Sequence, residues 1–199
     1  MRLTIFDYGA GNLHSLAKTL TLPGVELAIE TNPSRAVEET DALVLPGVGA
    51  FGLAAERLAR GRDAMLTALQ GGLPCLGICL GMQLLFDASD EGAGDGIGLI
   101  PGRVRRLKAH RVPQMGWNSL EEVHGEPLLA RAGLQDVYYA NGYVGAPLDA
   151  SVVTAWSTHE GDRFPASVRV GNVVGVQFHP EKSSAPGVRF MHEFLKELR

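Results

Sequence analysis

The chain has 199 residues, of which 45% are hydrophobic and 20% are charged, and its formal net charge is −4 at pH 7. These values are typical of a globular protein, and the mildly acidic balance gives no reason to expect nucleic acid or an anionic membrane as a partner. No apolar run approaches the roughly 20 residues that span a bilayer, and the first residues lack the pattern of a signal peptide. We therefore expect one cytoplasmic domain, residues 1–199.

The only two cysteines, Cys75 and Cys79, lie four positions apart. Two cysteines in one segment are a poor basis for a disulfide framework, so a reducing compartment fits best. Histidines also occur through the chain, but none has the spacing of metal ligands. We expect neither a metal nor another cofactor.

The first half of the chain alternates apolar runs with stretches of helical spacing. Strands are predicted at residues 2–6, 25–29, 41–45 and 73–78, and helices at residues 13–20, 51–60 and 63–71. Apolar strands without alternation are typical of a parallel sheet that is covered on both faces.

The second half of the chain is richer in short strand-like segments. These are predicted at residues 103–107, 120–123, 137–140, 151–156, 166–170 and 172–178, with hairpin turns at Gly161-Asp162 and Gly171-Asn172. Helical spacing returns at residues 186–198. The expected fold is therefore α/β: a three-layer sandwich with a mostly parallel central sheet, flanking helices and added antiparallel strands.

A sharp turn from strand to helix is predicted at Cys79. The apolar run ends in Gly77-Ile78-Cys79-Leu80-Gly81, and a helix-like stretch, residues 82–86, follows. This G-x-C-x-G pattern is that of a nucleophile elbow, whose bare neighbours let strand and helix approach each other. The positive end of a helix there would favour a thiolate. The pattern alone leaves a buried structural cysteine equally open.

A second candidate pair follows the strand predicted at residues 172–178. His179 and Glu181 are two apart, which in extended geometry points both side chains to the same side, and Pro180 helps to keep His179 extended. A histidine suits proton transfer with a cysteine nucleophile, and a carboxylate would fix its tautomer. Taken singly, His179 is also compatible with a structural histidine and Glu181 with a surface acid.

Acyl transfer also requires donors for an oxyanion. The backbone N–H of Leu80 at the elbow is one candidate. The glycine-containing loop at residues 46–49 follows the neighbouring strand and is the candidate for the second. On its own that loop reads as an ordinary strand-to-helix turn.

Three segments together resemble the class I, or triad, glutamine amidotransferases. They are Pro46-Gly47-Val48-Gly49-Ala50-Phe51, Gly77-Ile78-Cys79-Leu80-Gly81-Met82-Gln83 and Gln177-Phe178-His179-Pro180-Glu181-Lys182-Ser183. Within that family, residues 7–15, 113–118 and 181–184 are similar to the glutaminases that serve the cyclase subunit of imidazole glycerol phosphate synthase. The chain length also fits a subunit without a fused synthase.

The resemblance implies roles for individual residues. Cys79 would attack the side-chain amide of glutamine, His179 would serve as acid and base, and Glu181 would orient His179. The N–H groups of Val48 and Leu80 would form the oxyanion hole. The expected substrate-binding residues are Gly47, Gln83 and Glu91.

The resemblance also implies a partner. Ammonia would pass to a (β/α)8 cyclase subunit in a heterodimer, and Asn12, Trp117 and Lys182 match positions expected at that interface. One segment departs from the family: Asn141-Gly142-Tyr143 stands where a His-Ser-Tyr run is usual. Because that segment is expected to meet glutamine through its backbone, activity should survive.

Alternative functions remain open at this point. A glutaminase for pyridoxal phosphate, anthranilate or guanylate synthesis is disfavoured by residues 46–51 and 113–118. A cysteine peptidase of related fold is a further option. A binding subunit without catalysis is disfavoured because Cys79, His179 and Glu181 are all present.

Overall fold

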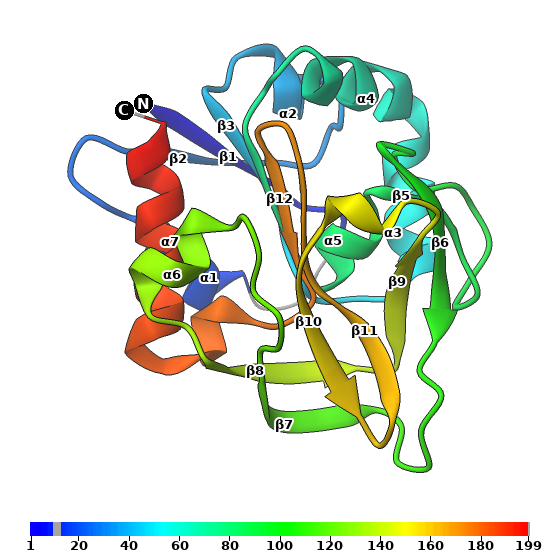
Figure 1. Ribbon diagram of the computed structural model, residues 1–199. Coiled ribbons are helices and arrows are strands. Elements are labelled where there is room, and N and C mark those ends of the chain that lie inside the picture. The colour runs from blue at the N-terminus through cyan, green and yellow to red at the C-terminus, as the bar shows by residue number, and fades with distance from the viewer. Residues whose placement is uncertain (10–12, 199) are drawn as a thin grey trace.

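The structure, a computed structural model, describes residues 1–9 and 13–198. Seven strands form its largest sheet: β1 (Arg2–Phe6), β2 (Glu26–Glu30), β3 (Ala42–Leu45), β4 (Cys75–Ile78), β10 (Val153–His159), β11 (Asp162–Val170) and β12 (Val173–Val176). Their order across the sheet is β10-β11-β12-β4-β3-β1-β2 (Figure 1). The five strands from β12 to β2 are parallel, and β10 and β11 add an antiparallel edge.

Helices cover both faces of this sheet. They are α1 (His14–Leu20), α2 (Arg35–Glu38), α3 (Phe51–Leu58), α4 (Arg62–Gln70), α5 (Leu80–Gln83), α6 (Pro127–Ala132) and α7 (Ser184–Glu197), with short 3-10 turns η1 (Ala59–Gly61), η2 (Ala150–Val152) and η3 (Pro180–Lys182). Apolar side chains of α1, α6 and α7 share one core cluster, and those of α3, α4 and α5 share another. The expected three-layer arrangement is therefore confirmed.

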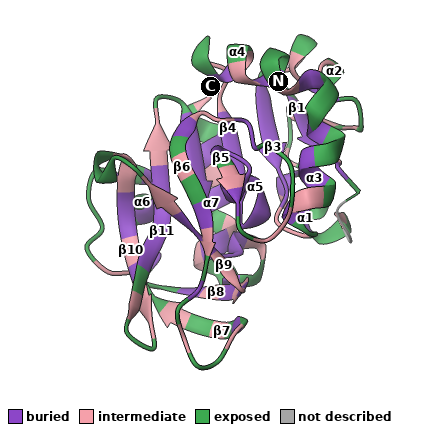
Figure 2. Ribbon diagram, turned by 90° about the vertical axis from the view of Figure 1, so that its right-hand side faces the viewer, coloured by how far each residue is buried: buried purple, intermediate pink, exposed green. Residues whose placement is uncertain are grey.

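The central strands explain the unbroken apolar runs of the sequence. Every residue of β3 and β4 is buried (Figure 2), because helices lie on both faces of the sheet. The predicted hairpins at Gly161 and Gly171 are also present. Both glycines have positive φ, +87° and +56°, which glycine adopts without steric cost.

Two smaller sheets were incompletely predicted. One contains β5 (Phe86–Ser89), β6 (Ile100–Arg106) and β9 (Tyr143–Pro147), and the other pairs β7 (Gln114–Ser119) with β8 (Asp136–Asn141). The predicted strand at residues 120–123 is wrong. Glu121 makes only an isolated bridge with Trp156, and the positive φ of Glu122, +46°, turns the chain away from further pairing.

The helix expected at residues 82–86 is confirmed only at Met82 and Gln83. The structure has a single helical turn, α5, and Phe86 already begins β5. Consecutive buried residues such as Leu84 and Leu85 suit a helix and a buried strand equally, so the apolar pattern alone could not place the boundary.

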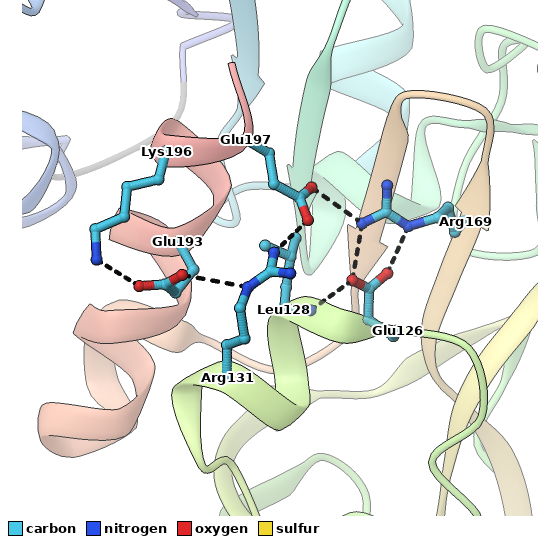
Figure 3. A network of polar contacts seen from close by, with 7 residues as sticks. All are labelled: Glu126, Leu128, Arg131, Arg169, Glu193, Lys196 and Glu197. Carbon is cyan, nitrogen blue, oxygen red and sulfur yellow. Dashed lines mark hydrogen bonds and ion pairs between the residues drawn. The ribbon is translucent and has the colours of Figure 1, made fainter. Parts of the chain in front are cut away.

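The C-terminal helix is fixed to the sheet by a charged network (Figure 3). Glu126 is buried, makes two hydrogen bonds of 2.7 and 2.8 Å with Arg169 of β11, and accepts one from the Leu128 N–H at the start of α6. Glu197 of α7 lies 3.5 Å from Arg169 and also contacts Arg131. The network therefore joins α6, α7 and β11.

Removing Arg169 should destabilise the protein strongly. Arg169→Met leaves the carboxylate of Glu126 buried without its counter-ion, which is expected to lower the free energy of unfolding by about 3–5 kcal/mol. Urea denaturation measures this. The control is Arg103→Met, since Arg103 pairs with Asp90 at the surface and its loss should cost about 1 kcal/mol or less. Equal losses in the two variants would contradict the prediction.

Candidate active site

The turn at Cys79 has the strained backbone that its sequence pattern predicts. Cys79 follows β4 directly and has φ +46° and ψ −101°, a conformation rare for residues other than glycine. Its N–H donates to the Val176 carbonyl at 2.7 Å. A Cβ atom at Gly81 would lie 2.0 Å from the Leu45 carbonyl oxygen, so only glycine fits there. The turn therefore holds Cys79 at the carboxyl edge of the sheet.

Pairing of β4 with β12 brings His179 to the same edge. The strands are parallel and Ile78 is in register with Val176, so residues just beyond each strand meet. His179 is extended, with φ −100° and ψ 97°, but Glu181 lies in the 3-10 turn η3. The expectation that extended geometry aligns His179 with Glu181 is therefore wrong. It is the turn that places Glu181 Oε1 2.7 Å from His179 Nδ1.

The surroundings of His179 favour its protonated form. Burial lowers its pKa, but the neighbouring side chains of Cys79 and Glu181 outweigh this effect and raise the pKa from 6.5 to about 9. A negative thiolate and a carboxylate both stabilise the imidazolium. The arrangement thus favours an imidazolium beside Cys79, with Glu181 behind it.

Cys79 and His179 open onto a cleft of about 190 Å³. Its walls come from the loop after β3, the elbow, the segment after β5, the β8–β9 turn and the two ends of η3. The lining residues are Gly47, Val48, Gly49, Cys79, Leu80, Gln83, Glu91, Ala140, Asn141, Gly142, Tyr143, His179 and Lys182. The residues predicted as nucleophile, base, oxyanion donors and substrate contacts therefore all border one cleft. Glu181, which was predicted to orient His179, lies behind that residue and does not line the cleft.

Both predicted substrate side chains have defined partners. Gln83 donates from Nε2 to the Tyr143 carbonyl at 3.0 Å, and Glu91 Oε2 accepts from the Phe51 N–H at the start of α3 at 3.0 Å. The segment that departs from the family thus meets the site partly through a backbone carbonyl.

The loop after β3 lies close against His179. A Cβ atom at Gly47 would be 2.9 Å from His179 Cε1, so any larger residue would displace the loop or the ring. Tyr8, which the sequence did not single out, is buried and donates its hydroxyl to the Pro46 carbonyl. Gly49 has φ +125°. This loop carries Val48, whose N–H is the second predicted oxyanion donor.

Trp117 and Lys182, two of the predicted interface residues, come together around Tyr138. The rings of Trp117 and Tyr138 meet edge to face with centroids 6.1 Å apart, and Lys182 Nζ lies 6.0 Å from the Tyr138 ring. Trp117 is 55% exposed and Met115, beside it on β7, is 64% exposed. The third predicted residue, Asn12, lies outside the described residues.

Two further side chains near the site escaped the sequence analysis. Ser183 accepts from the Tyr138 N–H and donates to the His179 carbonyl, so it fixes the backbone at His179. Gln177 donates from Nε2 to Cys79 Sγ at 3.4 Å. Both belong to the segment 177–183 that carries the family resemblance, but only the fold shows their contacts.

Two further features are absent from the described part of the chain. No three His, Cys, Asp or Glu side chains gather there as metal ligands would. Over residues 1–9 and 13–198, none of the helices has the length and apolar character needed to cross a membrane.

Comparison with known proteins identifies close sequence relatives. The family model described as glutamine amidotransferase class-I matches residues 4–198. The protein named imidazole glycerol phosphate synthase subunit HisH of Gloeothece citriformis is 42% identical, covering 99% of this chain and 96% of the relative. Its namesake in Halobacterium salinarum is 43% identical, with coverage of 97% and 92%.

Solved structures share the fold at lower identity. One described as a glutamine amidotransferase superposes with a TM-score of 0.75 at 22% identity, covering 98% of both chains. A chain of PurLQS from Thermotoga maritima gives a TM-score of 0.75 at 19% identity, with coverage of 100% and 99%. These likenesses establish the α/β architecture.

Proposed function

Because the chain belongs to the class-I glutamine amidotransferase family, we propose that it is the glutaminase subunit of an imidazole glycerol phosphate synthase. The observation that carries this proposal is the meeting of Cys79 and His179 at one cleft, with Glu181 hydrogen-bonded to His179 from behind. The two cysteines are free and buried, which fits a reducing cytoplasm.

The first half of the reaction forms a thioester. The Cys79 thiolate attacks the side-chain amide carbon of glutamine, and the N–H groups of Val48 and Leu80 stabilise the negative charge that develops on the amide oxygen. The His179 imidazolium then donates a proton to the amide nitrogen. The C–N bond breaks, ammonia leaves, and a glutamyl thioester remains on Cys79.

The second half releases glutamate. Neutral His179 takes a proton from water, and the resulting hydroxide attacks the thioester carbon. The C–S bond breaks, which restores the thiolate and the imidazolium. Glu181 holds His179 in the tautomer that both halves require. Gly47, Gln83 and Glu91 bind the substrate at the wall of the cleft.

In this proposal the released ammonia passes to a second subunit. The named relatives are subunits of a synthase, so we place this chain in a heterodimer with a (β/α)8 cyclase subunit. The cyclase would use ammonia to form imidazole glycerol phosphate and an aminoimidazole carboxamide ribotide for histidine biosynthesis. The exposed aromatic surface at Trp117, beside Lys182, supports this docking site, with Asn12 as the remaining proposed contact.

Truncation of Trp117 should weaken the complex. Exposed aromatic residues are common anchors at interfaces, and Trp117→Ala is expected to cost about 2 kcal/mol of binding, or roughly 30-fold in Kd. Calorimetric titration with the cyclase measures this. The matched control is Leu148→Ala, because Leu148 is also an exposed apolar residue, 84% accessible, and lies after β9. Unchanged affinity of the Trp117 variant would place the partner elsewhere.

Glutamine hydrolysis should depend on the partner. The Gly47-Val48 peptide can rotate in a glycine-containing loop, so we expect an incomplete oxyanion hole in the free subunit. Adding the cyclase with its nucleotide ligand should raise the hydrolysis rate about 100-fold or more, the usual value of one such donor. An ammonia-release assay with and without cyclase tests this. Full turnover by the free chain would contradict it, and cleavage of peptide or other γ-glutamyl substrates in preference to glutamine would refute the proposed function.

A further inference from the structure

The environment of the Cys79 sulfur contains an amide that the proposed chemistry does not yet use. Gln177 follows β12, is fully buried, and donates from Nε2 to Cys79 Sγ at 3.4 Å. Its other end, Oε1, accepts from Gln83 Nε2 at 3.2 Å. Gln83 Nε2 in turn donates to the Tyr143 carbonyl at 3.0 Å. The four groups form a continuous chain from the cleft wall to the nucleophile.

This chain fixes which end of each amide faces its neighbour. The Tyr143 carbonyl is a backbone oxygen and only accepts, so Gln83 must present its NH₂ group there. The same NH₂ group is the one that contacts Gln177, which must therefore present its oxygen. The NH₂ group of Gln177 is then left facing Cys79. A single backbone carbonyl thus determines that the atom beside the sulfur is a donor.

A donor at this position stabilises thiolate rather than thiol. Hydrogen bonds to a charged group contribute more than neutral ones. The need for such a donor is greater here because α5 has only four residues, so the field of an extended helix does not act on the sulfur. We propose that Gln177 is a further catalytic residue, whose amide N–H holds and stabilises the Cys79 thiolate.

Other titratable groups surround the sulfur and set the background for this effect. Tyr8 and Tyr139 are buried near Cys79, and burial raises the pKa of both, so they remain neutral. Glu91 and Lys182 border the cleft with opposite charges. His179, backed by Glu181, supplies the positive charge. Gln177 is distinct in offering a neutral donor whose orientation does not change with pH.

The variant Gln177→Glu tests the NH₂ end of the side chain separately from the oxygen end. Glutamate has the same shape and still offers Gln83 an oxygen, but it replaces the donor beside the sulfur with an acceptor. The rate of Cys79 alkylation by iodoacetamide, followed by mass spectrometry over a range of pH, reports thiolate without requiring glutamine. We expect the rate at pH 7 to fall about 10- to 100-fold and the midpoint of the alkylation profile to move to higher pH. The kcat for glutamine hydrolysis should fall more than KM changes.

Two comparisons complete the test. Gln114→Glu places the same change at another buried glutamine without contact to Cys79, and its alkylation profile should match that of the original protein. Gln177→Met removes the donor without adding charge, so it should also slow alkylation, and it provides the comparison if Gln177→Glu does not fold.

The role of Gln177 rests on Cys79 being the nucleophile of the proposed function. The experiment distinguishes failure of the nucleophile assignment from failure of the role of Gln177. If Cys79 in the unmodified protein reacts only as an ordinary thiol, both the nucleophile assignment and the role of Gln177 are overturned. If that cysteine is highly reactive and folded Gln177 variants keep the same profile, only the role of Gln177 is overturned.

Discussion

Cys79→Ser is expected to abolish glutamine-dependent synthesis by the complex and to spare synthesis from added ammonium. Serine keeps the shape of the elbow but lacks a readily ionised thiol, so the glutamyl thioester cannot form. Loss of a catalytic nucleophile can lower kcat on the order of 10⁶-fold. The cyclase reaction, assayed in parallel with glutamine and with ammonium chloride, measures both outcomes.

The matched control for this prediction is the other cysteine. Cys75 lies in β4, is fully buried, and has its thiol pKa raised by that burial. Cys75→Ala should therefore retain glutaminase activity and lose only stability. If Cys79→Ser removed the ammonium-dependent reaction as well, Cys79 would be a structural residue of the complex.

Glu181→Gln should lower kcat by about 10²- to 10⁴-fold and shift the pH profile. Because the pKa of His179 is raised to about 9, its imidazolium should persist up to that pH, and kcat/KM should fall above it. The glutamine side chain removes one of the two interactions that raise this pKa. The alkaline limb of the profile should therefore move to lower pH.

The raised pKa of His179 should also make the stability of the fold depend on pH. The folded-state pKa of His179 lies above its ordinary value of 6.5, so its contribution to folding is fully present below about pH 6.5 and is lost as the pH rises through about 9. Glu181→Gln should lessen that loss.

The control for the activity profile is Glu122→Gln, which changes a carboxylate that pairs with Arg163 at the surface and should leave that profile unchanged. An unmoved alkaline limb in Glu181→Gln would show that Glu181 does not act through His179.

The proposed oxyanion donors, base and thiolate donor reach Cys79 by different structural routes. Leu80 is positioned by the elbow itself, since it is the first residue of α5. Val48 depends on the loop after β3, which Tyr8 holds through Pro46. Gln177 and His179 both arrive through β12. The glycines leave the loop that carries Val48 adjustable, so we expect binding of the partner to act on that loop.

The sequence alone determined the features that depend on local geometry. Glycines flanking Cys79 predict the sharp turn because a side chain there would collide with the neighbouring strand, as it would at Gly81 against Leu45. The unbroken apolar runs of β3 and β4 predict buried parallel strands. Helix α6 was missed although its local signals are present, with Pro127 in its first turn and Gly133 left-handed at its end.

Only the tertiary structure decided how distant segments meet. β4 and β12 are separated by about a hundred residues, and no periodicity encodes that they pair, yet this pairing alone sets Cys79 beside His179 and Gln177. The exposure of Trp117 follows likewise from β7 lying at an outer edge with β8 as its partner. Local steric rules thus specify which residue can be a nucleophile, whereas the long-range strand order specifies which groups can activate it.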